Sequence, residues 1–145
     1  MPTREQLLET AKRYVDAHNS RNVEAIRACC SPSSTHRGGP SSVNGPDRTR
    51  DEYVAFNADV FKMLHSYHAE LTDAIVDPET RKVAMFLHAK ATADAGEYEN
   101  EYIITVTMTE DGKLVQDQYD FIDSHTMLQW IQKVGQFAQE TWEKK

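Results

Sequence analysis

Residues 83–122, VAMFLHAKATADAGEYENEYIITVTMTEDGKLVQDQYDFI, decide the fold. Apolar and polar residues alternate through most of this stretch, which is the period of half-buried strands. Gly96 interrupts the pattern within Asp94–Glu97, and Glu110–Gly112 contains an Asp-Gly pair typical of hairpin turns. These signals predict three successive antiparallel strands, at Val83–Thr92, Tyr98–Thr109 and Leu114–Ile122.

Helical patterns lie on both sides of these strands. Thr3 with Gln6, and Thr49 with Glu52, have the spacing of a capping box, so each pair predicts the start of a helix. Apolar residues then recur at helical spacing. The predicted helices end near Asn19, cover Val23–Cys29, run from the second capping box to about Tyr67, and follow a cap at Asp123 or Ser124.

The segment Ser31–Asp47, SPSSTHRGGPSSVNGPD, is the least regular part of the chain and predicts a long loop. Glu70–Val76 adds a fourth strand. The order is therefore helix, helix, loop, helix, four antiparallel strands and a closing helix. Segregated helices and strands predict an α+β fold. A length of 145 residues suits a single domain over residues 1–145.

Composition excludes several classes of protein. The net charge of −7 argues against non-specific nucleic-acid binding and against a surface that holds anionic lipid. No uncharged stretch approaches the roughly 18 residues of a spanning helix. The N-terminus has no apolar segment of a secretory signal, and Cys29 and Cys30 are neighbours that predict no disulfide. We therefore expect a cytoplasmic protein.

The predicted sheet favours a pocket. A long antiparallel sheet curls because its strands twist, and helices packed on one face make the curl a cone. The predicted third helix is apolar over more than half its circumference, so we expect it inside the cone. Asn57 falls within its apolar face, and Asn100 and Tyr102 share a strand face with apolar residues. Polar groups on buried faces find partners or line a cavity, which predicts a partly polar pocket.

The layout resembles the nuclear-transport-factor-2-like cone and, within it, the SnoaL-like polyketide cyclases. The segments that carry this resemblance are TAKRYVDAHNSRNVEAI (10–26), RTRDEYVAF (48–56), GEYENEYIITVTMT (96–109) and GKLVQDQYDFIDS (112–124). A more specific resemblance is carried by the combination of three motifs, PSSVNGPDRTRDEY, YENEY and DFIDS. This combination resembles fungal SnoaL-like proteins, including isomerases of meroterpenoid biosynthesis.

The resemblance implies a cone-shaped α+β fold, a homodimer with sheets packed face to face, and no cofactor. It predicts an acid–base isomerase or cyclase that rearranges a polyketide-like or meroterpenoid lactone in fungal secondary metabolism. The partner is then a hydrophobic small-molecule substrate. Two alternatives stay open. One is a dehydratase or lactone hydrolase that uses a pocket water, and the other is a non-catalytic module that binds a small molecule or a protein.

Cofactor-free isomerisation needs a proton acceptor and a proton donor in a dry pocket. The resemblance places Asp120 at the acidic position before the aromatic residue in the family's last-strand motif, so Asp120 is the first catalytic candidate. Burial would raise its pKa into the range of a useful base. Gly112–Asp123 is one residue longer than is common in the family, and a bulge there could turn Tyr119 inward in place of Asp120. Asp123 also matches the motif, but we expect it to cap the last helix.

His65, at the edge of the predicted third helix, and His125, at the start of the closing helix, are the other catalytic candidates. Each could be a donor or a base at the pocket wall, and an exposed surface histidine is the alternative for each. His65 with His68 is the one tightly spaced histidine pair, but it has no Glu or Cys nearby, so no metal site is predicted. The predicted substrate-binding residues are Arg50, His36, Asn57, Asn100 and Tyr102.

Overall fold

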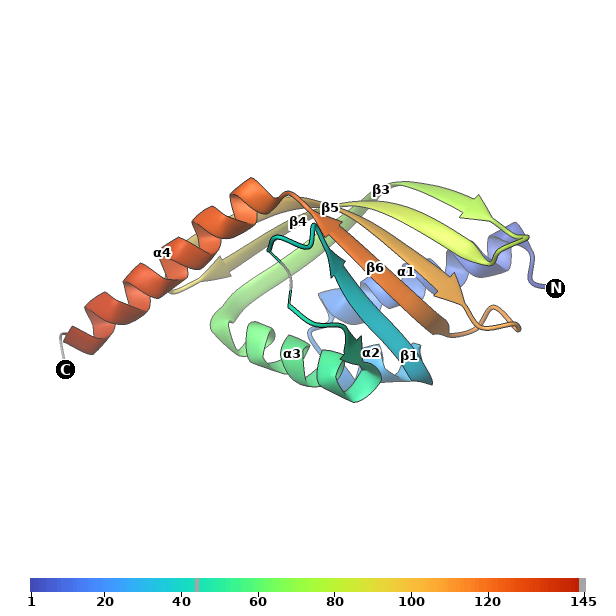
Figure 1. Ribbon diagram of the computed structural model, residues 1–145, viewed down its shortest axis with the longest axis horizontal. Coiled ribbons are helices and arrows are strands. Elements are labelled where there is room, and N and C mark those ends of the chain that lie inside the picture. The colour runs from blue at the N-terminus through green and yellow to red at the C-terminus, as the bar shows by residue number, and fades with distance from the viewer. Residues whose placement is uncertain (44, 144–145) are drawn as a thin grey trace.

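The computed structural model describes residues 1–43 and 45–143. Over these residues, a curved sheet of six strands in the order β2-β1-β6-β5-β4-β3 forms the framework (Figure 1). The helices are α1 (Arg4–Asn19), α2 (Val23–Ala28), α3 (Arg50–Met63) and α4 (Ser124–Glu143). The strands are β1 (Cys30–Gly39), β2 (Arg48–Thr49), β3 (Leu64–Asp77), β4 (Lys82–Ala93), β5 (Gly96–Met108) and β6 (Val115–Ile122).

Part of the predicted loop is a strand. Residues 30–39 form β1, which pairs parallel with β6 and antiparallel with the short β2. The four predicted strands, β3 to β6, pair antiparallel with one another as expected, and the unpredicted β1 adds a parallel pair that makes the sheet mixed. The strand β1 was not predicted because residues such as Ser34 and His36 are buried and polar, so the segment has no apolar alternation. Asn44, in the same predicted loop, lies outside the described residues.

The third helix is shorter than predicted. It starts at the Thr49–Glu52 capping box as expected, but it ends at Met63 and not near Tyr67. Leu64 has an extended backbone, with φ −101° and ψ 136°, and begins β3. The apolar spacing around Tyr67 fits either a helix or a strand, and the long ladder between β3 and β4 selects the strand.

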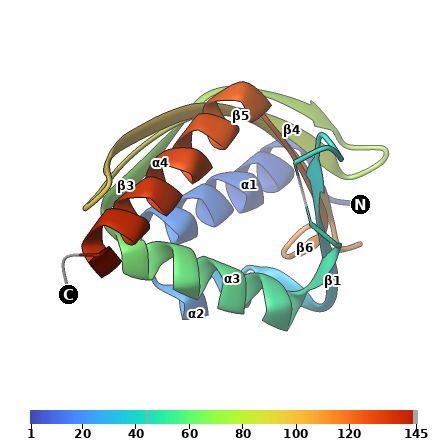
Figure 2. The same ribbon diagram turned by 60° about the vertical axis from the view of Figure 1, so that its left-hand side comes forward.

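The first helix, and not the third, fills the concave side of the sheet. Figure 2 shows α1 lying under the curved strands, with α2 and α3 along the opposite open side. Fully or almost fully buried residues of α1 pack in one core with residues of β4, β5 and β6; the core includes Leu7, Ala11, Tyr14, Val83, Met85, Val106, Met108 and Val115. On α3, the buried residues are Tyr53, Val54 and Asn57. The expectation that α3 occupies the interior is corrected accordingly.

The last strand contains the irregularity that its length suggested. Thr107 pairs with Asp117 and Met108 with Val115, so one residue, Gln116, is extra on β6. Beyond this bulge, Asp120 and its neighbours at alternate positions face the interior of the cone. Tyr119 faces outward, where the Arg37 guanidinium carbon lies 5.4 Å from the centre of its ring.

The closing helix α4 begins at Ser124 and projects beyond the sheet (Figure 1). Asp123 caps it, as predicted: its Oδ1 accepts from the Thr126 backbone N–H at 3.3 Å. The Trp130 ring packs on Tyr98 with 5.2 Å between ring centres. Among residues 124–143 none is buried, so α4 contacts the body of the protein only at its side. Over the described residues, no helix is both long and apolar enough to cross a membrane.

Candidate active site

Asp120 carries the carboxyl group that faces the interior. It lies on β6 opposite Ile104 of β5, among side chains of the concave face. Desolvation raises the pKa of Asp120 from 3.8 to about 6, and a hydrogen bond from Gln118 opposes this rise. That bond joins Gln118 Nε2 to Asp120 Oδ1 at 2.6 Å. A carboxylate of this pKa is a stronger base than an ordinary aspartate and is still ionised at neutral pH.

Gln118 connects Asp120 to three other elements. Its side chain is 1% exposed. Its Oε1 accepts from Tyr14 of α1 and lies 2.9 Å from His36 Nδ1 of β1. Its Nε2 lies 3.2 Å from the Tyr53 hydroxyl of α3. One amide therefore ties β6 to α1, β1 and α3 in the immediate surroundings of the candidate base.

His36 lies inside the protein and not in a loop. Its ring is 3% exposed and stacks on Tyr53 with 4.1 Å between ring centres. Nε2 is 3.0 Å from Ser34 Oγ, so both ring nitrogens have partners. Burial lowers the pKa of His36 below 6.5, which keeps the imidazole neutral at pH 7. His36 was expected in a loop. The structure places it on β1, inside the network around Asp120.

A second set of polar side chains, on β5, also faces the interior of the cone. Asn100 Nδ2 donates to the Tyr98 hydroxyl at 2.7 Å, and the Tyr98 and Tyr102 hydroxyls lie 2.6 Å apart. Burial raises the pKa of Tyr102 well above 10, and the charge of Asp120 raises it further. The same two causes raise the pKa of Tyr67 on β3 to about 12. These tyrosines are neutral hydrogen-bond donors near one carboxylate.

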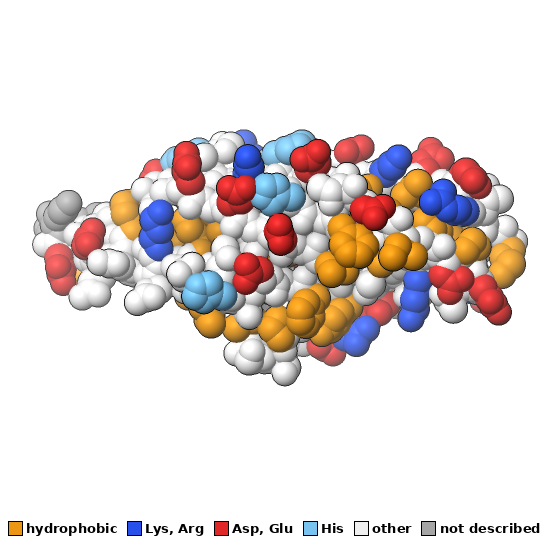
Figure 3. All heavy atoms as spheres, turned by 90° about the horizontal axis from the view of Figure 1, so that it is seen from above, with side chains coloured by type: hydrophobic (Ala, Val, Ile, Leu, Met, Phe, Trp, Pro, Cys, Tyr) orange, Lys and Arg blue, Asp and Glu red, His pale blue; other side chains and the backbone are white. Residues whose placement is uncertain are grey.

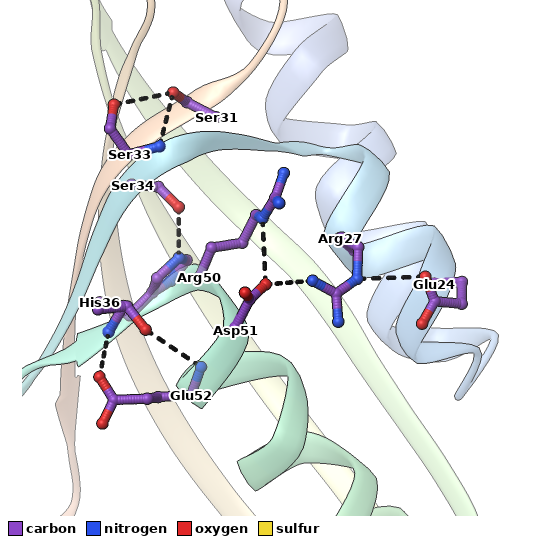
Figure 4. A network of polar contacts seen from close by, with 10 residues as sticks. Glu24, Arg27, Ser31, Ser33, Ser34, His36, Arg50, Asp51 and Glu52 are labelled. Atoms are coloured by element: carbon purple, nitrogen blue, oxygen red, sulfur yellow. Dashed lines mark hydrogen bonds and ion pairs between the residues drawn. The ribbon is translucent and has the colours of Figure 1, made fainter.

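Asn57 and Arg50 lie at the α3 side of the interior. Asn57 is buried and donates to the Tyr53 carbonyl at 2.9 Å. Figure 4 shows Arg50 between the Ser34–His36 pair and the neighbouring helix α2. Its Nε lies 3.6 Å from Asp51 Oδ1, beyond hydrogen-bond distance. Among the described residues, the Arg50 Nε is the one buried side-chain nitrogen or oxygen without a hydrogen bond.

The two catalytic histidine candidates lie outside the site. His65 is on strand β3 and not on a helix, its side chain is 63% exposed, and Nε2 pairs with Asp94. His125 is exposed in the first turn of α4, which passes along the start of β5 and then projects beyond the sheet (Figure 1). Neither is in contact with the interior polar groups, so their placement at the pocket wall was wrong. The errors follow from the early end of α3 and from the direction of α4.

Sequence reasoning missed three of the residues around Asp120: Tyr14, Tyr53 and Gln118. Tyr14 and Tyr53 lie on apolar helix stripes, where a tyrosine is indistinguishable from a core residue until its hydroxyl partner is known. Gln118 had a signal, because it shares the inner face of β6 with Asp120 at a spacing of two. Within the described residues, no group of three or more His, Cys, Asp or Glu side chains could hold a metal ion.

The outer face of the sheet is a different surface. A shallow depression of about 500 Å³ lies there, lined among others by Phe86, Ile103 and Phe121. Ile103 and Phe121 are 42% and 48% exposed. Figure 3, seen from above, shows hydrophobic side chains gathered among acidic side chains and histidines on this face. Asp120 points to the other side of the sheet, and its side chain does not line this depression.

Comparison with known proteins gives a consistent result. The profile of the SnoaL-like domain matches residues 11–116. Austinoid biosynthesis clusters protein H of Penicillium brasilianum is 33% identical over 137 residues, which are 92% of this chain and 93% of that protein.

Solved structures agree with the sequence match. BvnE pinacolase from Penicillium brevicompactum superposes with a TM-score of 0.90 at 27% identity, over 94% of this chain and 99% of that one. AusH from Aspergillus nidulans superposes with a TM-score of 0.82 at 30% identity, over 86% and 88% of the two chains.

Proposed function

The chain belongs to the SnoaL-like family, and from this premise we propose that it is a cofactor-independent acid–base isomerase or cyclase of fungal secondary metabolism. The proposed substrate is a polyketide-like or meroterpenoid lactone. Relatives named for austinoid biosynthesis clusters, and a structural relative that is a pinacolase, support a tailoring role of this kind.

One observation carries the proposal. A carboxyl group with a pKa of about 6 faces the interior of the cone, and a single hydrogen bond from Gln118 holds its Oδ1. Among the described residues, no hydrogen bond to Oδ2 is found, and that atom is not among the buried ones that lack a partner. Asp120 Oδ2 thus has no hydrogen-bond partner among the described residues, and we take it as the atom that meets the substrate, as a general base must.

The proposed reaction uses Asp120 as base and Tyr102 as donor. Asp120 takes a proton from a carbon next to a carbonyl group, and the electron pair of the broken C–H bond forms an enolate. Tyr102 donates a hydrogen bond to the enolate oxygen, where negative charge develops. Asp120 then returns the proton to another carbon of the rearranged molecule. The product has the mass of the substrate, and no other reagent is consumed.

The hydroxyl groups on β5 suit this donor role. Asn100 Nδ2 fills one acceptor site of the Tyr98 oxygen. This favours Tyr98 as the donor in its 2.6 Å hydrogen bond with Tyr102. The Tyr102 proton is then available to a ligand. A chain of donors that ends in a free hydroxyl group polarises that group and strengthens the hydrogen bond it donates.

We also propose that the protein is a homodimer formed through the outer face of the sheet. Ile75, Ile103 and Phe121 are large apolar residues that are 62%, 42% and 48% exposed. Exposed apolar residues that cluster on one face mark an interaction surface. A second copy of the chain would cover this face and leave both interiors open to substrate.

The proposal places the protein in the cytoplasm. Cys29 and Cys30 are buried, and neither forms a disulfide. Free buried thiols suit a reducing compartment.

The function is tested by incubating the purified protein with a panel of meroterpenoid and polyketide lactones, without added cofactor, and following the products by mass spectrometry and NMR. A new isomer of unchanged mass supports the proposal. A gain of one water would replace it by a lactone hydrolase, and a loss of one water by a dehydratase. Tight binding of the lactones without conversion would identify a binding module.

A further inference from the structure

Gln118 is the residue through which Asp120 is connected to the rest of the site. It lies near the middle of β6, paired with His36 of β1 on one side and Val106 of β5 on the other. Its side chain is 1% exposed and makes hydrogen bonds in four directions. An uncharged amide buried to this degree requires satisfied donors and acceptors, so the direction of each bond can be worked out.

The hydrogen-bond partners of His18 determine the direction of the hydrogen bond between Tyr53 and Gln118. His18 Nδ1 lies 2.8 Å from the Tyr14 carbonyl oxygen, which can only accept, so Nδ1 carries the proton. Burial lowers the pKa of His18 to about 4, so the ring is neutral and Nε2 is an acceptor. Tyr53 lies 2.8 Å from Nε2 and must donate its hydroxyl proton there. The Tyr53 oxygen is then an acceptor toward Gln118.

This direction fixes the orientation of the Gln118 amide. Its nitrogen donates one hydrogen to the Tyr53 oxygen at 3.2 Å and the other to Asp120 Oδ1 at 2.6 Å. Its oxygen accepts from Tyr14 and from His36 Nδ1. The flipped amide would place its oxygen against two acceptors, the Asp120 carboxylate and the Tyr53 oxygen. Both hydrogens and both acceptor sites of the amide are used in one orientation only.

We propose that Gln118 is a positioning residue, which holds Asp120 Oδ1 and leaves Oδ2 directed at the substrate. This inference rests on the proposed function, because it assigns Asp120 as the base. Tyr14, His36 and Tyr53 prevent Gln118 from rotating, and Gln118 in turn restrains the Asp120 carboxylate. The pre-organised carboxylate loses little freedom when the substrate binds.

Among the described residues, no charged side chain is positioned to replace this hydrogen bond in stabilising ionised Asp120. The titratable side chains that feel the charge of Asp120 are tyrosines, which are neutral at pH 7, and burial raises the pKa of each further; they are Tyr14 on α1, Tyr53 on α3, Tyr67 on β3 and Tyr102 on β5. His36 on β1, which reaches Asp120 through Gln118, is also neutral. The bond from Gln118 therefore stabilises the ionised form of Asp120 without a nearby cation.

The test replaces Gln118 by Met, which keeps the length of the side chain and removes both polar groups, and by Asn, which keeps the amide but is too short to bridge. Gln116→Met is the matched control, because Gln116 lies on the same strand and donates to Ser33. The ¹³Cγ resonance of Asp120, assigned with Asp120→Asn, is titrated in each folded variant. Circular dichroism and thermal unfolding verify the fold.

The titration midpoint of Asp120 is expected to rise by about one pH unit in Gln118→Met and in Gln118→Asn. It should stay unchanged in Gln116→Met. The acid limb of kcat/KM should move by the same amount, with kcat at neutral pH reduced about tenfold and KM nearly constant. A merely structural role predicts lower thermal stability with no shift of the midpoint, and that result would overturn the inference.

The NMR titration does not need turnover. If the wild type converts no lactone and the midpoint still rises in the Gln118 variants, the proposed function fails while the restraint on Asp120 stands. If the wild type converts a lactone and neither variant shifts the midpoint or the acid limb, the function stands and the positioning role is refuted. If Gln118→Met does not fold, Gln118→Asn decides between these results.

Discussion

Gln118 and Asp120 stand two residues apart on the inner face of one strand, and Nε2 of the first lies 2.6 Å from Oδ1 of the second. The bond joins the candidate base to three further elements through Tyr14, His36 and Tyr53. Because this network lies between the sheet and the helices, its chemistry and the stability of the fold are coupled.

Asp120→Asn should stabilise the protein at neutral pH. The pKa of Asp120 rises from 3.8 to about 6 on folding, so the folded state binds more protons than the unfolded state between these values. The free energy of unfolding therefore falls as pH rises through this window, by up to about 3 kcal/mol. Urea unfolding of both proteins at pH 7.5 should show most of this gain in Asp120→Asn. At pH 3.5 the two proteins should be equally stable, and a gain that persists there would refute the assigned cause.

Tyr102→Phe should reduce the rate of isomerisation about 10- to 100-fold, because the enolate oxygen loses its donor in the transition state. KM should change little, since the aromatic ring remains. The variant leaves Tyr98 with its Asn100 partner, so the fold should be retained. Steady-state kinetics measure the effect. A rise in KM at constant kcat would instead assign Tyr102 to substrate binding alone.

His65→Ala and His125→Ala should each keep kcat/KM within about twofold of the wild type. Both side chains are exposed, and the ion pair of His65 with Asp94 is a surface contact that contributes little to stability. The kinetic assay used for Tyr102→Phe measures this directly. A loss of tenfold or more in either variant would return a catalytic role to that histidine.

Phe121→Asp should convert the proposed dimer to a monomer. A buried carboxylate at the centre of the outer sheet face opposes association, because its desolvation is not compensated. Phe56→Asp is the control, since Phe56 is 42% exposed on α3 and Phe121 is 48% exposed on the sheet. Size-exclusion chromatography with light scattering should give a dimer for the wild type and for Phe56→Asp. A monomeric wild type would refute the dimer.

Regular alternation made β4, β5 and β6 predictable, and the capping boxes made the starts of α1 and α3 predictable. Residues 30–39 were missed as a strand because their inward side chains, such as Ser34 and His36, are polar and belong to the hydrogen-bond network around Gln118. His36 is the example: it looks like a loop residue in the sequence and is 3% exposed in the structure. The buried polar network around Gln118 thus removed the periodicity that reveals ordinary strands.

The site was predicted in part. Asn100 and Tyr102 lie on the inner face of a strand whose alternation was visible, so the facing of their side chains could be predicted. For Asp120 the sequence left open whether it or Tyr119 faces inward, because the position of the bulge depends on the pairing of β6 with β5. His65 was misplaced because the helix-to-strand boundary at Met63 depends on pairing with β4, which is distant in the sequence. Tyr53 and Gln118 became meaningful only when their hydrogen-bond partners were known.

The most direct test of Asp120 as the base is proton exchange at the substrate. A lactone that the protein converts is incubated in D₂O, and incorporation of deuterium is followed by NMR for the wild type, Asp120→Asn and Asp117→Asn. Asp117 is the matched control, since it lies on β6 but pairs with Arg37 on the outer face. Exchange and conversion should be lost in Asp120→Asn and kept in Asp117→Asn. Exchange at the wild-type rate in Asp120→Asn would contradict the assignment of the base.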